Sequence, residues 1–180
     1  MASAHKQVVE KTRHWVETIV VGLALCPFAR SELASKRVQF TVSDALSEEQ
    51  LLMDLQQSLS ELADNSAIET TLLIHPDVLQ DFYDYNQFLD LADALLLDLG
   101  LEGVYQVASF HPDYQFADTE PDAARNYSNK SPFPMLHLIA EETLEKAIDN
   151  TPDVHLIPER NAALLEKLGI VKLKEMLNPK

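Results

Sequence analysis

Cysteine and glycine are scarce in this chain of 180 residues, which contains one Cys and four Gly. The single Cys26 excludes a disulfide within one copy of the chain, and this favours a reducing compartment. No repeat, low-complexity tract or flexible linker interrupts the sequence. We therefore expect a cytoplasmic protein with a single domain over residues 1–180.

Long hydrophobic runs are also absent, since none approaches the roughly 18 apolar residues that a membrane-spanning helix requires. Basic residues followed by the apolar run 19–25 and Cys26 imitate a lipoprotein signal. The bulky Leu25 stands where such a signal needs a small residue, and apolar residues recur at helical spacing from Val8 to Leu23. The pattern therefore predicts an amphipathic helix over residues 4–25 and no membrane partner.

Positive charge is missing from the middle of the chain, because no Lys or Arg occurs from Thr41 to Ala124. The formal net charge is −15. A polyanion such as nucleic acid needs a basic surface, so we expect no nucleic-acid partner. The acidic middle is typical of solvated helix faces, and the alternative is a surface for a cationic partner or a metal ion.

Hydrophobic periodicity and turn residues predict alternating helices and strands. Strands are expected at residues 38–42, 71–74, 104–110 and 154–157. Helices are expected at residues 4–25, from a capping box at 47–50 onward, and at 77–99, 131–148 and 161–168, with an irregular tract at 117–130. Buried strands separated by helices predict an α/β fold with a small, mostly parallel sheet of three to four strands flanked by helices.

Two of the expected strands end in the same tripeptide, His75-Pro76-Asp77 and His111-Pro112-Asp113. Ligands of open parallel sheets bind outside the carboxyl ends of the strands. If the two strands are neighbours, their imidazoles and carboxylates meet, which suits acid/base chemistry or a metal ion. The alternative is that Pro-Asp only begins a helix, and Asp77 is expected to do no more than that.

The first positive charges after the acidic middle are Arg125 and Lys130, in the irregular tract. Together with Arg160 they would form an anion pocket at one edge of the sheet. The alternative is that these cations pair with neighbouring Asp and Glu. We expect His137 on the polar face of the 131–148 helix, either in an exposed pair with Glu141 or as a metal ligand.

No phosphate-binding loop, dinucleotide fingerprint, nucleophile elbow, zinc spacing or His-Glu-x-x-His motif occurs. Cys26 would lie at the C-terminal end of a helix, where the helix dipole opposes a thiolate. A buried structural cysteine is therefore expected rather than a nucleophile.

Several segments together resemble one bacterial family of uncharacterised proteins of about this length, a domain of unknown function. The resemblance rests on SFHPDYQF (109–116), NYSN (126–129), SPFPMLHL (131–138) and PERN (158–161), together with 25–29 and 81–86. It covers nearly the whole chain and implies a stand-alone bacterial cytosolic domain. It implies no activity, substrate or cofactor.

The leading hypothesis is an enzyme that acts on a small anionic metabolite by general acid/base chemistry around His111, with Asp113 orienting the imidazole. The substrate contacts would be Arg125, Asn126, Tyr127, Asn129 and Arg160. One alternative is a non-catalytic module that binds a ligand or a protein. Another is a metal protein that uses His111 and Asp113 with His75 or His137.

Overall fold

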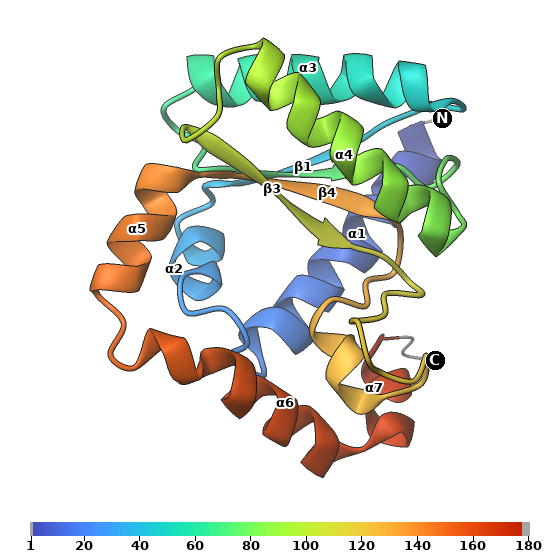
Figure 1. Ribbon diagram of the computed structural model, residues 1–180, viewed down its shortest axis with the longest axis vertical. Helices are drawn as coiled ribbons and strands as arrows, with labels where there is room; N and C mark the ends of the chain where they lie inside the picture. Colours follow the sequence, from blue (N-terminus) through green and yellow to red (C-terminus); the bar gives the residue numbers. More distant parts are fainter. Residues whose placement is uncertain (1, 178–180) are drawn as a thin grey trace.

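A central four-stranded sheet carries helices on both faces in the computed structural model, which describes residues 2–177 (Figure 1). This confirms the α/β class and the number of strands. In chain order the elements are α1 (Ala2–Trp15), the π-helix η1 (Val16–Val21), α2 (Ala29–Ala34), β1 (Val38–Val42), α3 (Glu48–Asp64), β2 (Thr70–Ile74), α4 (Phe82–Asp98), β3 (Tyr105–Phe110), the 3₁₀ helix η2 (Ala124–Ser128), β4 (Met135–Ala140), α5 (Glu141–Asp149), the 3₁₀ helix η3 (Val154–Leu156), α6 (Ile157–Leu168) and α7 (Ile170–Leu177).

The strands lie in the order β1-β2-β4-β3, and β4 runs antiparallel to both of its neighbours. The sheet is therefore mixed, with one parallel pair, and the expectation of a mostly parallel sheet is wrong. The cause is the segment 135–140, which was expected to be helical. It forms a central strand, and a short apolar run buried on both faces of a sheet resembles a buried helix in its periodicity.

The expected strand at residues 154–157 is wrong as well, because the chain there forms η3 and then enters α6 at Ile157. Pro158 lies in the first turn of α6. Proline is favourable there because the N–H that it lacks would have no partner within the helix. The second half of the expected helix at 131–148 is confirmed as α5.

The N-terminal helix changes its winding at Val16, where the α-helix gives way to η1. A Cβ at Gly22 would lie 2.3 Å from the carbonyl oxygen of Thr18, so only glycine fits behind this widened turn. Ala24 follows with a positive φ of 53°. π-helical turns often mark functional positions in α-helices.

Polar caps set where α3 and α4 begin. Ser47 caps α3 by accepting a hydrogen bond from the Gln50 backbone N–H at 3.3 Å, which confirms the expected helix start. Asp81, rather than Asp77, caps α4 by accepting from the N–H groups of Tyr83 and Asp84. Consequently α4 begins after a turn that follows β2.

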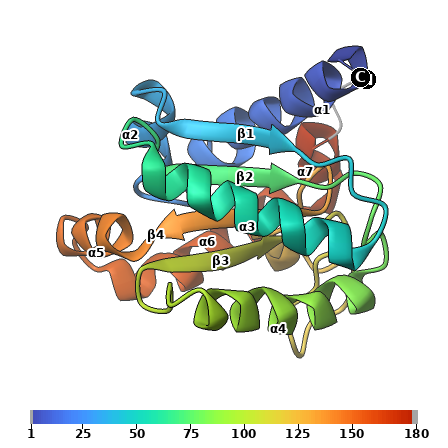
Figure 2. The same cartoon turned by 90° about the horizontal axis from the view of Figure 1, so that it is seen from above.

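Alternate residues of the central strands point to opposite faces of the sheet and pack in two hydrophobic layers. Leu73, Leu136 and Leu138 pack against α3 and α4 on one face. On the other face Leu72, Ile74 and Met135 pack against α1 and η1. Figure 2 shows α3 and α4 in front of the sheet and α1 behind it. Over residues 2–177 no helix combines the length and the apolar character that a membrane crossing requires.

Candidate functional site

Three strand ends lie at one edge of the sheet, because β1, β2 and β3 all point the same way (Figure 2). Ser43, His75 and His111 directly follow these strands. The start of β4 lies between the ends of β2 and β3, so these two strands are not neighbours. The sequence nevertheless predicted correctly that polar side chains follow the strands at this edge.

His75 and His111 meet at this edge through the turn before α4. The Nδ1 of His75 donates to the carbonyl of Val78 at 3.0 Å, and the Nε2 of His111 donates to the next carbonyl, Leu79, at 3.2 Å. Both rings are fully buried and pack against Tyr85, with ring centroids 5.8 Å and 5.0 Å away. The pair therefore holds this turn against the sheet.

The charge state of both imidazoles follows from their burial. Burial lowers the pKa of His75 to about 4, and burial also lowers the pKa of His111. His111 uses both ring nitrogens, because its Nδ1 accepts from the backbone N–H of Asp113 at 3.0 Å. A general base needs an accessible lone pair, so these contacts favour a structural role for His111. The catalytic role of His111 and Asp113 stays a prediction.

Tyr85 braces the ends of β3 and β4. Its hydroxyl donates to the carbonyl of Met135 at 2.8 Å and accepts from the N–H of Phe110 at 3.0 Å. Burial raises the pKa of Tyr85 far above its ordinary value, so the hydroxyl keeps its proton. This bridge positions Phe110, whose ring lies on the opposite face of the sheet from His111.

The tract after β3 is folded around Asn126, which is completely buried. Its Oδ1 accepts from the Phe116 N–H at 3.2 Å and from the Thr119 hydroxyl at 2.9 Å, and its Nδ2 donates to the Glu120 carbonyl at 2.9 Å. Tyr127 is buried next to Leu165 and Leu173 of the C-terminal helices. Asn126 and Tyr127, both expected to contact substrate, thus lie in the interior, where they shape the loop.

A cleft of about 510 Å³ opens behind this loop, and we call it the α6 cleft. It lies where η1, the end of β3, η2 and the first turn of α6 meet. Its lining residues come from four separate parts of the chain: Val20, Leu25, Cys26, Phe110, Phe116, Arg125, Ser128, Asn129, Ile157, Pro158, Asn161 and Ala162. The volume falls within the roughly 300–1,000 Å³ that is usual for small-molecule sites.

Only some of the predicted substrate contacts line the α6 cleft. Arg125 and Asn129 line it. Arg160 lies next to Asn161 in the chain and donates to the Ala24 carbonyl at 3.2 Å. Lys130 does not line the cleft; its ammonium lies 5.4 Å from the centroid of the Tyr127 ring. Ser128, Cys26 and the apolar wall were not predicted.

The lining of the α6 cleft contains no Asp or Glu, although the chain carries 29 of them. Arg125 is exposed there, and none of the ion pairs formed within residues 2–177 involves it. The expectation that cations near this edge pair with acidic neighbours therefore does not apply to Arg125. An arginine at the rim of an apolar, carboxylate-free cavity attracts an anion.

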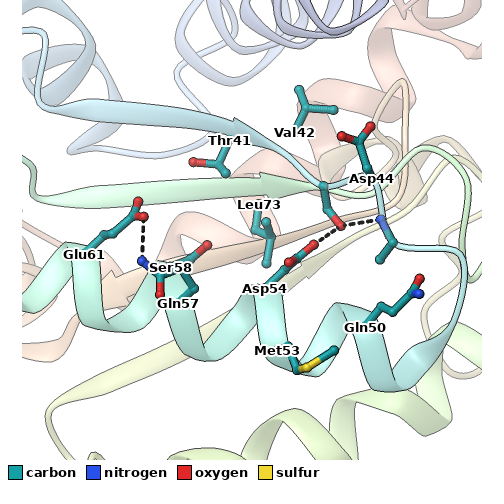
Figure 3. A pocket seen from close by; sticks show the side chains of 12 residues that line it. Thr41, Val42, Asp44, Gln50, Met53, Asp54, Gln57, Ser58, Glu61 and Leu73 are labelled. Carbon is teal, nitrogen blue, oxygen red and sulfur yellow. Dashed lines mark hydrogen bonds between the residues drawn. The ribbon is translucent and has the colours of Figure 1, made fainter. Parts of the chain in front are cut away.

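A second cavity, of about 410 Å³, differs from the α6 cleft because carboxylates line it (Figure 3). It lies between β1 and α3, and Asp44, Asp54 and Glu61 are in its lining. Asp54 accepts a hydrogen bond from the hydroxyl of Ser43 at 2.5 Å. These carboxylates leave no place for an anion, so the acidic character of the chain extends into this cavity.

Cys26 lies on the wall of the α6 cleft and is partly exposed, not buried as expected, because the cleft opens beside it. Burial raises the pKa of its thiol, and hydrogen bonds from the backbone N–H groups of Ala29 and Phe28 offset this only in part. The sulfur is therefore a neutral thiol at pH 7, as expected for a cysteine that is not a nucleophile.

His75 and His111 lie close together, but no third ligand joins them to form the expected metal site within residues 2–177. His137 lies within β4, not on an exposed helix face as predicted, and its Nε2 is 2.6 Å from the hydroxyl of Thr70. Across residues 2–177 no three His, Cys, Asp or Glu side chains converge as a metal-binding group. The geometry gives no support to a metal centre built on His111 and Asp113.

Comparison with known protein families identifies the family of this chain. A family described as a protein of unknown function, DUF1415, matches residues 7–175. The chain belongs to this family. No curated protein and no solved structure is significantly similar to the chain.

Proposed function

We propose that this protein binds a small monoanionic molecule with an apolar body in the α6 cleft. One observation carries the proposal: Arg125 lines an apolar cavity that contains no carboxylate, in a chain with a formal net charge of −15. A favourable site for an anion is improbable by chance on such an acidic protein, because carboxylates elsewhere repel the ligand.

The chemistry of the lining indicates the kind of anion. One guanidinium matches one carboxylate, which it can bind through two parallel N–H···O hydrogen bonds. Ser128 and Asn129 add neutral polar groups beside Arg125. Apart from Cys26 and Asn161, the rest of the wall is aliphatic or aromatic, which favours an apolar body over a sugar or a polyphosphate. Arg160, on the first turn of α6, is next to the lining residue Asn161 in the chain, but its guanidinium donates to the Ala24 carbonyl.

Hydrogen bonds hold this geometry in place before any ligand arrives. Asn129 donates from Nδ2 to the Ser109 carbonyl at 3.1 Å, and the hydroxyl of Ser128 donates to Oδ1 of Asn129 at 2.8 Å. Asn161 donates from Nδ2 to the Leu25 carbonyl at 2.8 Å. Preorganised contacts of this kind lower the entropic cost of binding.

An NMR titration with benzoate tests the proposal, with neutral benzamide as the matched ligand. Benzoate is expected to shift the backbone amide signals of Ser128 and Asn129, and benzamide is expected to bind more weakly. Arg125→Ala should weaken benzoate binding by roughly 10- to 100-fold, since hydrogen bonds between charged groups contribute about 1.5–3 kcal/mol. Arg125→Lys should restore only part of the affinity, because an ammonium lacks the planar pair of donors.

Lys6→Ala is the matched control, because it removes one cation that is 76% exposed on α1, well before the part of the N-terminal helix that lines the cleft. Its benzoate affinity should equal that of the unmodified chain. If benzoate and benzamide bind equally, or if Arg125→Ala and Lys6→Ala behave alike, the proposal is wrong.

A further inference from the structure

A smaller cavity, distinct from the acidic cavity between β1 and α3, adjoins the α6 cleft, and we call it the inner cavity. It measures about 170 Å³ and lies between the sheet and the layer formed by α1, η1 and α2. Val20, Cys26 and Phe110 line both cavities, so these three side chains form their common wall. All three are only partly buried. The two cavities therefore meet at side chains that solvent still reaches.

The surface of the inner cavity is apolar, although polar residues belong to its lining. The hydroxyl of Thr70 donates to the Leu138 carbonyl at 2.7 Å and therefore accepts from Nε2–H of His137. The carboxylate of Glu32 is held by Arg37 at 2.8 Å. These partners are all protein groups. The indole nitrogen of Trp15, by contrast, is buried without a hydrogen-bond partner. An occupant would touch mainly the indole, phenyl and aliphatic groups of the remaining lining, among them Trp15, Val20, Ala29, Ala108 and Phe110.

The ligand class follows from this pair of cavities and rests on the proposed function. We propose that the α6 cleft and the inner cavity together hold one amphiphilic monocarboxylate, with its carboxylate on Arg125 and its hydrocarbon chain beyond Cys26 and Phe110 in the inner cavity. An apolar cavity of about 150 Å³ accommodates benzene, so the inner cavity has room for about six carbon atoms. A straight chain of about eight carbons, counted with the carboxyl group, therefore spans both.

The winding of the N-terminal helix contributes to this arrangement. Val16 and Val20 are both in η1 and both line the inner cavity. A π-helical turn is wider than an α-helical one and is often found at functional sites. Gly22 allows this backbone, because a Cβ there would collide with the Thr18 carbonyl. Gly22 thus permits the π-helical backbone of η1, whose residues Val16 and Val20 line the inner cavity.

The chain provides two built-in reporters for a test, because it has one Trp and one Cys. Trp15 lines the inner cavity, and Cys26 lines both cavities. The experiment titrates the full chain with sodium butyrate, hexanoate, octanoate and decanoate. It follows binding by calorimetry, Trp15 by fluorescence and Cys26 by its alkylation rate with N-ethylmaleimide.

Affinity should increase about fourfold for each added methylene from butyrate to octanoate, and then level off as the inner cavity fills. Octanoate should change the fluorescence of Trp15 and slow the alkylation of Cys26 at least tenfold. Butyrate should change the fluorescence of Trp15 much less, because only about two of its four carbons would enter the inner cavity. Equal affinity for butyrate and octanoate, or unchanged Trp15 fluorescence at saturating octanoate, would overturn the inference.

Variants separate this inference from the proposed function. Ala108→Leu fills part of the inner cavity and should abolish the preference for octanoate while leaving butyrate affinity unchanged; Ala29→Leu is a second such variant, on α2. Ala63→Leu adds the same atoms at an exposed position of α3 and should keep the preference. If the folded Ala108→Leu and Ala29→Leu proteins both keep the preference for octanoate over butyrate, the inference fails. If Arg125→Ala binds every chain length as tightly as the unmodified protein, the proposed function fails instead.

Discussion

Asn161 donates a hydrogen bond from Nδ2 to the backbone carbonyl of Leu25 at 2.8 Å, which joins the first half of α6 to the segment just before Cys26. The two residues are 136 positions apart in the chain. This bond brings together two walls of the α6 cleft. It also sets the orientation of the amide, because a flipped amide would place its oxygen against the Leu25 carbonyl.

Replacing Asn161 with Ala should lower the free energy of unfolding by about 1–2 kcal/mol and weaken binding in the α6 cleft, because a buried hydrogen bond is lost and α6 is released. Urea denaturation measures the first effect and benzoate titration the second. Asn150→Ala is the control, since Asn150 is exposed and lies at the end of α5. Unchanged benzoate affinity in Asn161→Ala would show that this bond does not shape the site.

His111→Ala should destabilise the protein by about 3 kcal/mol. It removes a buried ring from Tyr85 and Phe82 and leaves the Leu79 carbonyl and the Asp113 N–H without their partner. His155→Ala, at an exposed position of η3, should change stability by less than about 0.5 kcal/mol. A His111→Ala protein with unchanged stability would instead revive the acid/base role predicted for this residue.

Stability should fall as the pH is lowered from about 6.5 toward 4. Burial lowers the pKa of His75 and of His137 to about 4 in the folded protein, whereas an unfolded histidine titrates near 6.5. The unfolded chain therefore binds more protons across this window, so the free energy of unfolding decreases as the pH falls. The full effect is roughly 3 kcal/mol for each imidazole.

Urea denaturation at pH 5.0, 6.0 and 7.0 measures this dependence. His137→Leu removes one of the two groups and should make the dependence clearly shallower. His14→Ala, at an exposed position of α1, should leave it unchanged. Equal slopes in His137→Leu and the unmodified chain would contradict the assignment.

Tyr85→Phe should loosen the junction of β3 and β4, because the Phe110 N–H and the Met135 carbonyl both lose their bond to the hydroxyl. Hydrogen exchange of the Phe110 amide should accelerate, and the free energy of unfolding should fall by about 1–3 kcal/mol. Amides that pair β1 with β2 are the internal reference. Unchanged exchange at Phe110 would mean that the bridge contributes nothing in solution.

Much of the fold was predictable, because the information for it is local. Capping at Ser47, the strand before His75 and the strand before His111 all follow from short-range patterns. The strand around His137 was not predictable in this way. Its apolar residues face both layers of the protein, and only the tertiary arrangement distinguishes such a strand from a helix.

The site was predictable only in part. The return of positive charge at Arg125 indicated the loop that lines the α6 cleft, and the end of the strand before His111 lies at the same cleft. The cleft itself also needs Val20 of a π-helix and the first turn of α6. Nothing local in the sequence places these two segments side by side. For the same reason the interior roles of Asn126 and Tyr127 could not be foreseen.

A crystal structure of the protein in complex with benzoate tests the central claim most directly. The account predicts the carboxylate within hydrogen-bond distance of the Arg125 guanidinium, about 2.9 Å, and the ring against Phe110 and Phe116 in the α6 cleft. Benzoate bound elsewhere, with the α6 cleft free of it, would contradict the account.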